Sequence, residues 1–147
     1  MIVLQKMLCC KFKITAAFFA MLFYCPGVLA EVVVVNESVG RGVIDKNTLL
    51  SIFRMNKLSW SDGQQIKVFV LPPDNPVHAR FSKKILNTLP HNLQRYWNRM
   101  VFSGAGEGPE MVWSENEMLM RVSSTAGSIG YVMDAGHVKS IKVLYVE

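Results

Sequence analysis

The stretch "QIKVFVLPPDNPVHARFSKKIL", from Gln65 to Leu86, decides the fold. Its first part alternates in polarity, as a strand does, and ends at Pro72-Pro73. Asn75 and Pro76 then suit the N-cap and the first position of a helix. A helix that begins directly after a strand is typical of α/β domains, and its N-terminus attracts anions through free N–H groups and the helix dipole. The corner between the two therefore has the shape of an anion site.

Strand and helix signals are interspersed along the rest of the chain. The β-branched run "EVVVV" (31–35) predicts a strand covered on both faces. The next predicted helix is capped by Asp45 or Asn47 and directs Leu49, Leu50 and Phe53 inward. After the corner, Val77, Phe81 and Ile85 face inward, and a helix from Pro90 directs Leu93, Trp97 and Met100 inward. A capping box at 114–117 opens a helix that stops at Gly127, and strands follow at "SIGYVM" (128–133) and "IKVLYV" (141–146). This order predicts an α/β fold with a mixed β-sheet flanked by helices.

The first thirty residues look like an export signal. Basic residues without an acidic one precede the apolar run "ITAAFFAMLFY" (14–24), which is short for a membrane span. "VLA" (28–30) resembles a signal-peptidase site. We predict a cleaved signal peptide at 1–30, with Met1 or Met7 as the initiator, and a periplasmic domain at 31–147. An uncleaved membrane anchor is the alternative.

Removal of residues 1–30 changes the composition of what remains. All three cysteines lie in that segment, so the domain has no thiol for catalysis or metal binding. Three of the 16 basic residues leave with it, and the remaining 13 against 11 acidic residues give a net charge of +2 instead of +5. This weak basicity argues against nucleic acid as a partner. The length suits one domain.

No motif points to catalysis. His78, His91 and His137 lack the spacing of metal ligands on one helix, and there is no G-x-S-x-G sequence. The loop "SGAGEGP" (103–109) follows a helix and lacks the Lys-Ser/Thr ending of a phosphate loop. We expect no enzyme, no metal and no cofactor. We expect the side chain of His78, in the first helical turn near Asp74, to be solvated, with contact to a ligand as the alternative.

Three segments in order resemble a known family. They are "DKNTLLSIFRMNKLSWSDGQQIKV" (45–68), "NLQRYWNRMVFSG" (92–104) and "STAGSIGYV" (124–132). Together they resemble phosphate-type ABC transporter substrate-binding proteins of the PstS kind, which have the type 2 periplasmic-binding-protein fold. The resemblance covers nearly all of 31–147 and implies a single lobe, because relatives with two lobes are longer.

The resemblance also implies where a ligand would sit. In the family, the corner carries an Arg and then Asp-Gly-Ser-Gly-Thr, which together hold the phosphate. Here Asp74 matches, while Pro72 stands at the Arg position, Asn75 at the first Gly, and 76–78 (Pro-Val-His) at Ser-Gly-Thr. Pro76 lacks a donor, so we expect oxyanion binding to be weak or degenerate.

Two functions remain open from the sequence. The first is a periplasmic solute-binding-like protein resembling the phosphate-binding component of an ABC transporter, with phosphate or another oxyanion held by Asp74, Asn75 and His78, and with Asn36 and Ser38 as neighbours. The second is a protein-interaction or accessory module on the same scaffold, without a small-molecule ligand. Its partner would be a periplasmic protein or a membrane permease. The sequence leaves the oligomeric state open.

Overall fold

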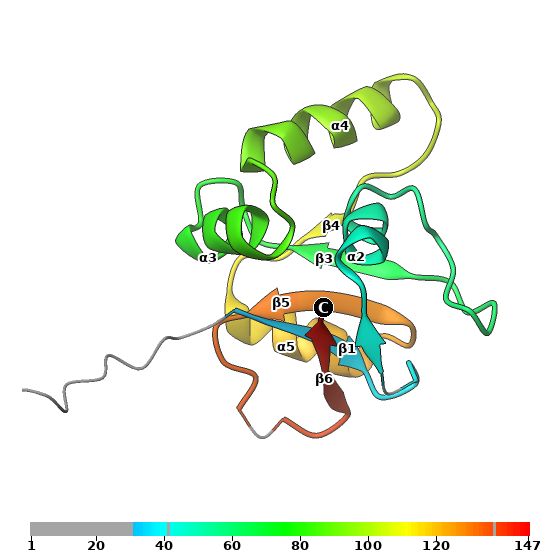
Figure 1. Cartoon of the computed structure of the whole chain (residues 1–147), viewed down its shortest axis with the longest axis vertical. Coiled ribbons are helices and arrows are strands. Elements are labelled where there is room, and N and C mark those ends of the chain that lie inside the picture. Colours follow the sequence, from blue (N-terminus) through cyan, green and yellow to red (C-terminus); the bar gives the residue numbers. More distant parts are fainter. Residues whose placement is uncertain (1–30, 41, 137) are drawn as a thin grey trace, which may run out of the picture.

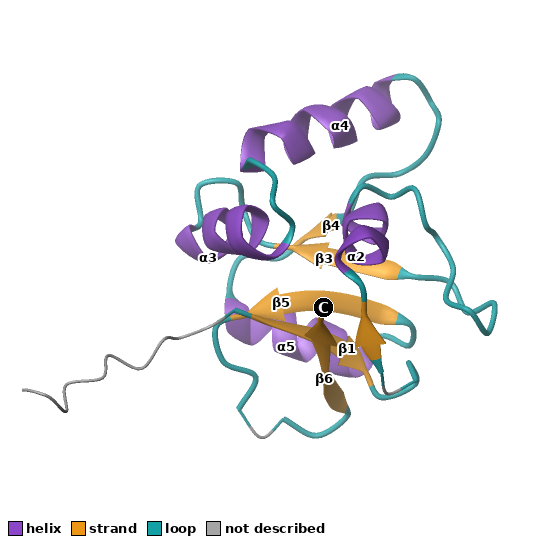
Figure 2. Ribbon diagram, in the orientation of Figure 1, coloured by secondary structure: helices purple, strands orange, loops and turns teal. Residues whose placement is uncertain are grey.

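A mixed sheet of six strands forms the centre of the computed structural model, which describes residues 31–40, 42–136 and 138–147. The predicted signal peptide lies outside these residues. In spatial order the strands are β2 (Val43–Ile44), β6 (Ile141–Val146), β1 (Val32–Asn36), β5 (Ser128–Val132), β3 (Lys67–Val70) and β4 (Glu110–Met111). β1 is antiparallel to both neighbours, whereas β3 is parallel to β5 and β4, and β2 to β6. The predicted α/β class is confirmed (Figures 1 and 2).

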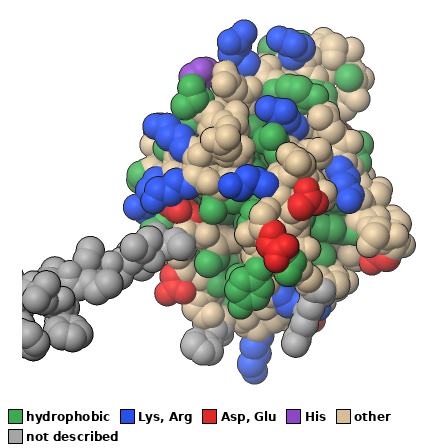
Figure 3. Space-filling view, in the orientation of Figure 1, with side chains coloured by type: hydrophobic (Ala, Val, Ile, Leu, Met, Phe, Trp, Pro, Cys, Tyr) green, Lys and Arg blue, Asp and Glu red, His purple; other side chains and the backbone are tan. Residues whose placement is uncertain are grey.

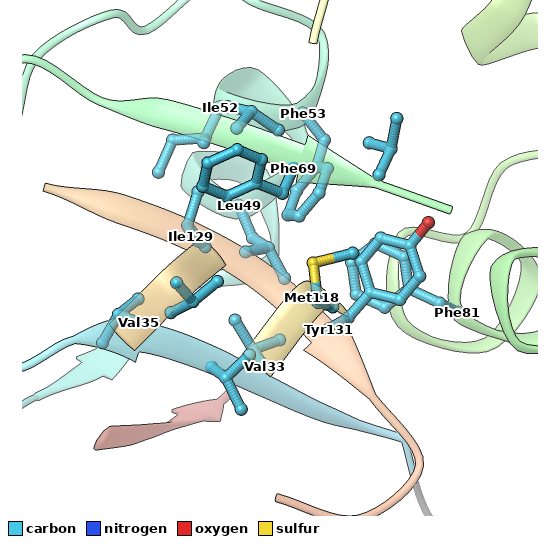
Figure 4. Close-up of a cluster of buried hydrophobic side chains, with 14 of the residues drawn as sticks. Val33, Val35, Leu49, Ile52, Phe53, Phe69, Phe81, Met118, Ile129 and Tyr131 are labelled. Carbon is cyan, nitrogen blue, oxygen red and sulfur yellow. The ribbon is translucent and has the colours of Figure 1, made fainter. Parts of the chain in front are cut away.

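Helices cover both faces of the sheet. One face carries α5 (Glu115–Ser124), which approaches β5 closely because Gly130 has no side chain: a Cβ there would lie 2.4 Å from the sulfur of Met118. On the other face, Tyr131 packs against Phe53 and Phe81. These rings belong to α2 (Lys46–Phe53) and to the helical segment after the corner. Figure 4 shows how strand and helix side chains meet in one core.

The helix that follows the corner changes its winding part-way. It begins as α3 (Pro76–Arg80) and continues as the π-helical turn η1 (Phe81–Ile85). A π turn inserts one residue per turn, so the core position after Phe81 passes from Ile85 to Leu86. Ile85 is half-buried, whereas Leu86 is buried. The predicted inward positions Val77 and Phe81 are confirmed, and the four-residue period fails only at this turn.

The outermost helix is α4 (Pro90–Phe102). Its buried residues are Leu93 and Trp97, as predicted, and the indole Nε1 of Trp97 donates a hydrogen bond to the carbonyl of Phe53 at 2.8 Å. Met100, which was also predicted to face inward, is half-buried. α4 is therefore fixed to α2 and lies over the helices, away from the sheet (Figure 1).

The predicted helix starts agree with the caps. Asp45 accepts from the N–H of Thr48, and Ser114 accepts from the N–H of Glu117. In a standard capping box the Glu117 carboxylate would accept from the N–H of the N-cap residue Ser114. Here it accepts from the N–H of Trp113, one residue earlier. The two-residue strands β2 and β4 are not predicted from sequence, because two residues carry no periodic pattern. Across the described ranges, no helix combines the length and apolar character that crossing a bilayer requires.

Candidate functional site

The corner after β3 is the site that the sequence singles out, and its helix start is capped by its own side chain. The amide oxygen of Asn75 accepts from the N–H of Val77 at 2.8 Å. The N–H of Asn75 donates to the carbonyl of Pro72 at 3.0 Å, which closes the turn. Pro76 has no N–H to offer. Of the first-turn donors that could face an anion, only the N–H of His78 is left.

The side chain of His78 is buried, and the expectation of a solvated side chain is wrong. It is 1% exposed and lies beneath the corner, because position 78 falls on the core side of the helix together with Val77. Its Nδ1 lies 2.5 Å from the hydroxyl of Tyr131. Burial lowers the pKa of His78 from 6.5 to about 4, so the ring is neutral at pH 7. The imidazole faces the interior of the protein and cannot meet a ligand in solvent.

Tyr131 joins the corner to the sheet. Its hydroxyl accepts from the N–H of Leu71 at 2.9 Å, and the hydroxyl proton is therefore free to go to Nδ1 of His78. Its ring stacks on Phe81 with centroids 3.9 Å apart and planes 6° apart. Burial raises the pKa of the phenol, which stays protonated. Sequence reasoning did not place Tyr131 in the site, although its alternation with Ile129 put it on the same face of β5.

The two ring nitrogens of His78 differ in their pairing. Nδ1 shares the short contact with the Tyr131 hydroxyl, in which either group can be the donor. Nε2 is buried and has no hydrogen-bond partner among the described residues, and neither does the hydroxyl of Ser82, one turn further along. A buried polar group left unpaired costs about 1–3 kcal/mol. The inner side of the corner therefore contains buried polar groups without hydrogen-bond partners among the described residues.

Asn36 and Ser38 do not neighbour the corner, and that expectation is wrong. β1 is antiparallel to β5 and β5 is parallel to β3, so the end of β1 lies beside the start of β3. The corner follows the end of β3 and therefore lies at the opposite end of the strands. The extended strand of "EVVVV" gives no signal for this direction, because pairing is set by tertiary structure.

Both residues make internal hydrogen bonds at their own end of the sheet. The side-chain N–H groups of Asn36 donate to the carbonyls of Val122 and Ser123 at 2.8 and 2.9 Å, at the end of α5 where helix carbonyls lack intrahelical partners. The hydroxyl of Ser38 accepts from the N–H of Gly127 at 2.9 Å. These contacts join the first strand to the turn between α5 and β5.

Asp74 is the predicted ligand residue of the corner that is exposed. It lies beside Pro73, and a carboxylate there repels an oxyanion unless cations surround it. The glycine-rich loop after α4 borders a separate pocket of about 350 Å³, whose wall carries Glu107, Glu110 and Lys67. Glu110 is paired with Arg121, so Glu107 and Lys67 leave this wall without a net positive charge to attract an anion. In the described part of the chain, no group of three His, Cys, Asp or Glu residues is placed to hold a metal ion.

Comparison with solved structures gives the same fold. PstS from Borrelia burgdorferi matches with a TM-score of 0.60 and 15% sequence identity over 80% of this chain and 47% of that chain. An ABC-type phosphate transport receptor from Vibrio cholerae matches with a TM-score of 0.57 at 15% identity, over 80% of this chain and 47% of its own. A possible phosphate binding protein from Planctomyces limnophilus matches with a TM-score of 0.58 at 14% identity, over 80% and 41%.

These similarities define the class of fold. The chain has an α/β fold like that of periplasmic binding proteins, and it spans about half the length of the solved structures it matches. No family model matches the sequence, and the search of curated proteins found no match. At 14–15% identity the similarity establishes the scaffold and leaves the ligand open.

Proposed function

We propose that this chain is an exported, non-catalytic module built like one lobe of a solute-binding protein, and that it holds phosphate or another oxyanion only weakly. The scaffold supports the first part, since solved structures that share it are described as a phosphate transport receptor and a possible phosphate binding protein. The predicted signal peptide at 1–30 supports export to the periplasm. We do not expect bound oxyanion to survive purification.

The observation that carries the weak affinity is the self-capped corner. Asn75 occupies the N–H of Val77, and Pro76 removes the preceding donor. Each charge-assisted hydrogen bond to an anion contributes about 1.5–3 kcal/mol, whereas micromolar binding requires about 8 kcal/mol. A single amide, that of His78, falls well short. A second lobe from another chain would have to supply the remaining contacts.

The test restores the missing donors and asks whether oxyanion affinity appears. In the double variant Asn75→Gly/Pro76→Ser, the N–H of Val77 is freed and position 76 regains an N–H and a hydroxyl. We expect wild type to show no thermal shift at micromolar phosphate, and the variant to bind phosphate at least tenfold more tightly in an NMR titration, with amide shifts at residues 76–78. Each restored bond accounts for roughly a factor of ten.

The matched control is Pro90→Ser, which replaces the proline at the same position of α4. It should leave phosphate affinity unchanged. Tight binding by wild type, with backbone amide shifts at the corner, would show that the self-capped helix start is no obstacle. No gain in the double variant would favour the alternative function, an interaction module without a small ligand.

A further inference from the structure

The charges of the domain are separated between its helical half and the rest. The stretch 46–104, which contains α2, α3, η1 and α4, carries nine basic and two acidic residues, namely Lys46, Arg54, Lys57, Lys67, Arg80, Lys83, Lys84, Arg95 and Arg99 against Asp62 and Asp74. Figure 3 shows Lys and Arg side chains over the upper part of this view, where Figure 1 places α3 and α4, and Asp and Glu side chains mostly below them. The modest net charge of 31–147 therefore hides a strongly basic stretch of sequence, only part of which lies on one face.

The outward face of α4 carries part of this basic stretch. His91, Arg95, Arg99 and Phe102 follow one another at steps of four, four and three residues, which places them on one helix face, opposite the buried Leu93 and Trp97. All four are exposed, and Phe102 is 88% exposed. Phe102 therefore presents an apolar ring to solvent beside the cations at the C-terminal end of α4.

η1 extends this face with Lys83. Lys83, His91 and Arg95 line one shallow hollow of about 460 Å³, together with the half-exposed Leu89, and no carboxylate lines it. We call Lys83, Arg95 and Arg99 the basic face. The two ion pairs within the described residues are Arg80 with Glu31 and Arg121 with Glu110, so the basic face has no internal counter-charge there.

We propose that the basic face binds the surface of an anionic phospholipid bilayer, with Phe102 inserted among the headgroups. Long cationic side chains spread over a helix face reach a plane of phosphates without a specific geometry, and each contributes through proximity to the surface. An aromatic ring beside them adds apolar burial at the interface. The arrangement resembles an interfacial helix, except that the apolar face of α4 packs against the protein core.

A folded acidic protein fits these features less well. Protein interfaces obtain most of their affinity from aromatic or Arg anchors that fill pockets at the centre of a dry patch. Here the aromatic residue protrudes at the end of the face, and the hollow beside Leu89 is open and lined by cations. A bilayer accepts a protruding ring wherever it falls.

The experiment measures co-sedimentation of the full chain with vesicles of mixed phosphatidylglycerol and phosphatidylcholine, against vesicles of phosphatidylcholine alone. Residues 1–30 contain an apolar segment that can bind any vesicle, so the comparison is between variants that share it. The test variant is Lys83→Gln/Arg95→Gln/Arg99→Gln. The control variant, Lys46→Gln/Lys67→Gln/Lys139→Gln, removes three exposed positive charges from elsewhere.

We expect the test variant to bind anionic vesicles roughly 100-fold more weakly than wild type, at about a factor of five for each charge, and the control variant to lose much less. Binding by wild type should fall as ionic strength rises from about 0.1 M to about 1 M, where the screening length shrinks from ~10 Å to ~3 Å. Phe102→Ser should weaken binding about tenfold without changing this salt dependence.

Equal losses in the test and control variants would overturn the proposal, because binding would then follow net charge alone. So would a wild-type preference for anionic over neutral vesicles that is no larger than the preference of the test variant. If the basic face instead retained an acidic protein in a pull-down and showed no vesicle preference, the partner assigned here would be wrong. All variants are surface changes, and circular dichroism of each variant would check that it is folded.

Discussion

At both ends of the central sheet, polar side chains connect strands to neighbouring segments by hydrogen bonds. The two ends differ in how many of these polar groups have a hydrogen-bond partner. At the Gly127 end, formed by Asn36, Ser38, Trp60 and Gly127, each named side chain bonds a backbone group of another segment. At the Tyr131 end, formed by Leu71, His78 and Tyr131, the chain of hydrogen bonds stops at an unpaired Nε2 within the described residues. The polar side chains of the first end are therefore paired, whereas the second end contains a buried histidine whose pKa is lowered by burial.

The difference shows why residue type alone misplaces a binding site. Asn and Ser after a strand are the groups that contact ligands at sheet edges, yet here they complete the end of α5 and the turn that follows it. A His in the first turn of a helix suggests contact with an anion, yet this ring is directed inward. In both places the backbone has unpaired groups of its own, and the nearest polar side chains satisfy them.

The largest expected loss of stability comes from a substitution at the Gly127 end. Gly127 has a φ of +73°, and a Cβ there would lie 2.3 Å from the carbonyl oxygen of Gln65. Because that contact is with backbone of the strand connection, neither side can yield cheaply. We expect Gly127→Ala to lower the free energy of unfolding by about 4 kcal/mol, from the clash and the left-handed backbone together, as measured by urea denaturation.

Gly63→Ala is the matched control for Gly127→Ala. Gly63 also has a positive φ, +86°, but a Cβ at this position would meet no other atom within 4 Å. It should cost only the backbone term, about 1–2 kcal/mol. Equal losses in the two variants would mean that the close approach at Gln65 is not a constraint on the turn.

Much of the fold could be predicted because its elements carry strong local signals. The run "EVVVV", the caps at Asp45, Asn75 and Ser114, and the closing strands are each written in a few adjacent residues. The pairing of those strands is not local. It decided that Asn36 lies at the opposite end of the sheet from Asn75, and no single-sequence pattern carries that information.

The candidate site was harder to predict than the fold because burial reverses the meaning of a polar residue. His78 stands next to Val77 and four residues from Ser82, and all three are buried through the turn of the helix. Its partner Tyr131 is 53 residues away. The self-capping role of Asn75, in contrast, depends on residues two positions apart and was anticipated from them.

The second effect concerns pH and belongs to the Tyr131 end. The pKa of His78 is about 4 in the folded protein against 6.5 in the unfolded chain. Between these values the unfolded chain binds more protons, so the stabilisation is complete above pH 6.5 and is lost as the pH falls toward 4. The difference amounts to at most about 3 kcal/mol. Asp45, whose pKa is lowered by its bonds to Thr48, loses its contribution only below this window.

Urea denaturation at intervals between pH 7 and pH 4 measures this loss. His78→Leu should be less stable at pH 7 but should have a flatter pH dependence across the window, because it has no imidazole to protonate. His91→Gln, which changes an exposed ring, should keep the wild-type slope. If His78→Leu retains the full slope, another group is responsible and the buried ring is not the sensitive point of this end.

The smallest of the three effects removes a single oxygen from the same end. Tyr131→Phe keeps the ring stacked on Phe81 but leaves the N–H of Leu71 and Nδ1 of His78 without their partner. We expect a loss of about 2 kcal/mol in the free energy of unfolding, the lower bound for two buried groups that cost about 1–3 kcal/mol each when unpaired, because the ring packing is preserved. Tyr145→Phe, at a residue 72% exposed, should be neutral.

The Tyr131→Phe variant also sharpens the comparison of the two ends. Without the hydroxyl, Nδ1 of His78 can take the proton, and the pH dependence of the unfolding free energy should change along with its magnitude. A loss confined to stability, with the pH profile of wild type intact, would show that Tyr131 supports Leu71 alone and that the hydrogen bond to His78 does not set its titration.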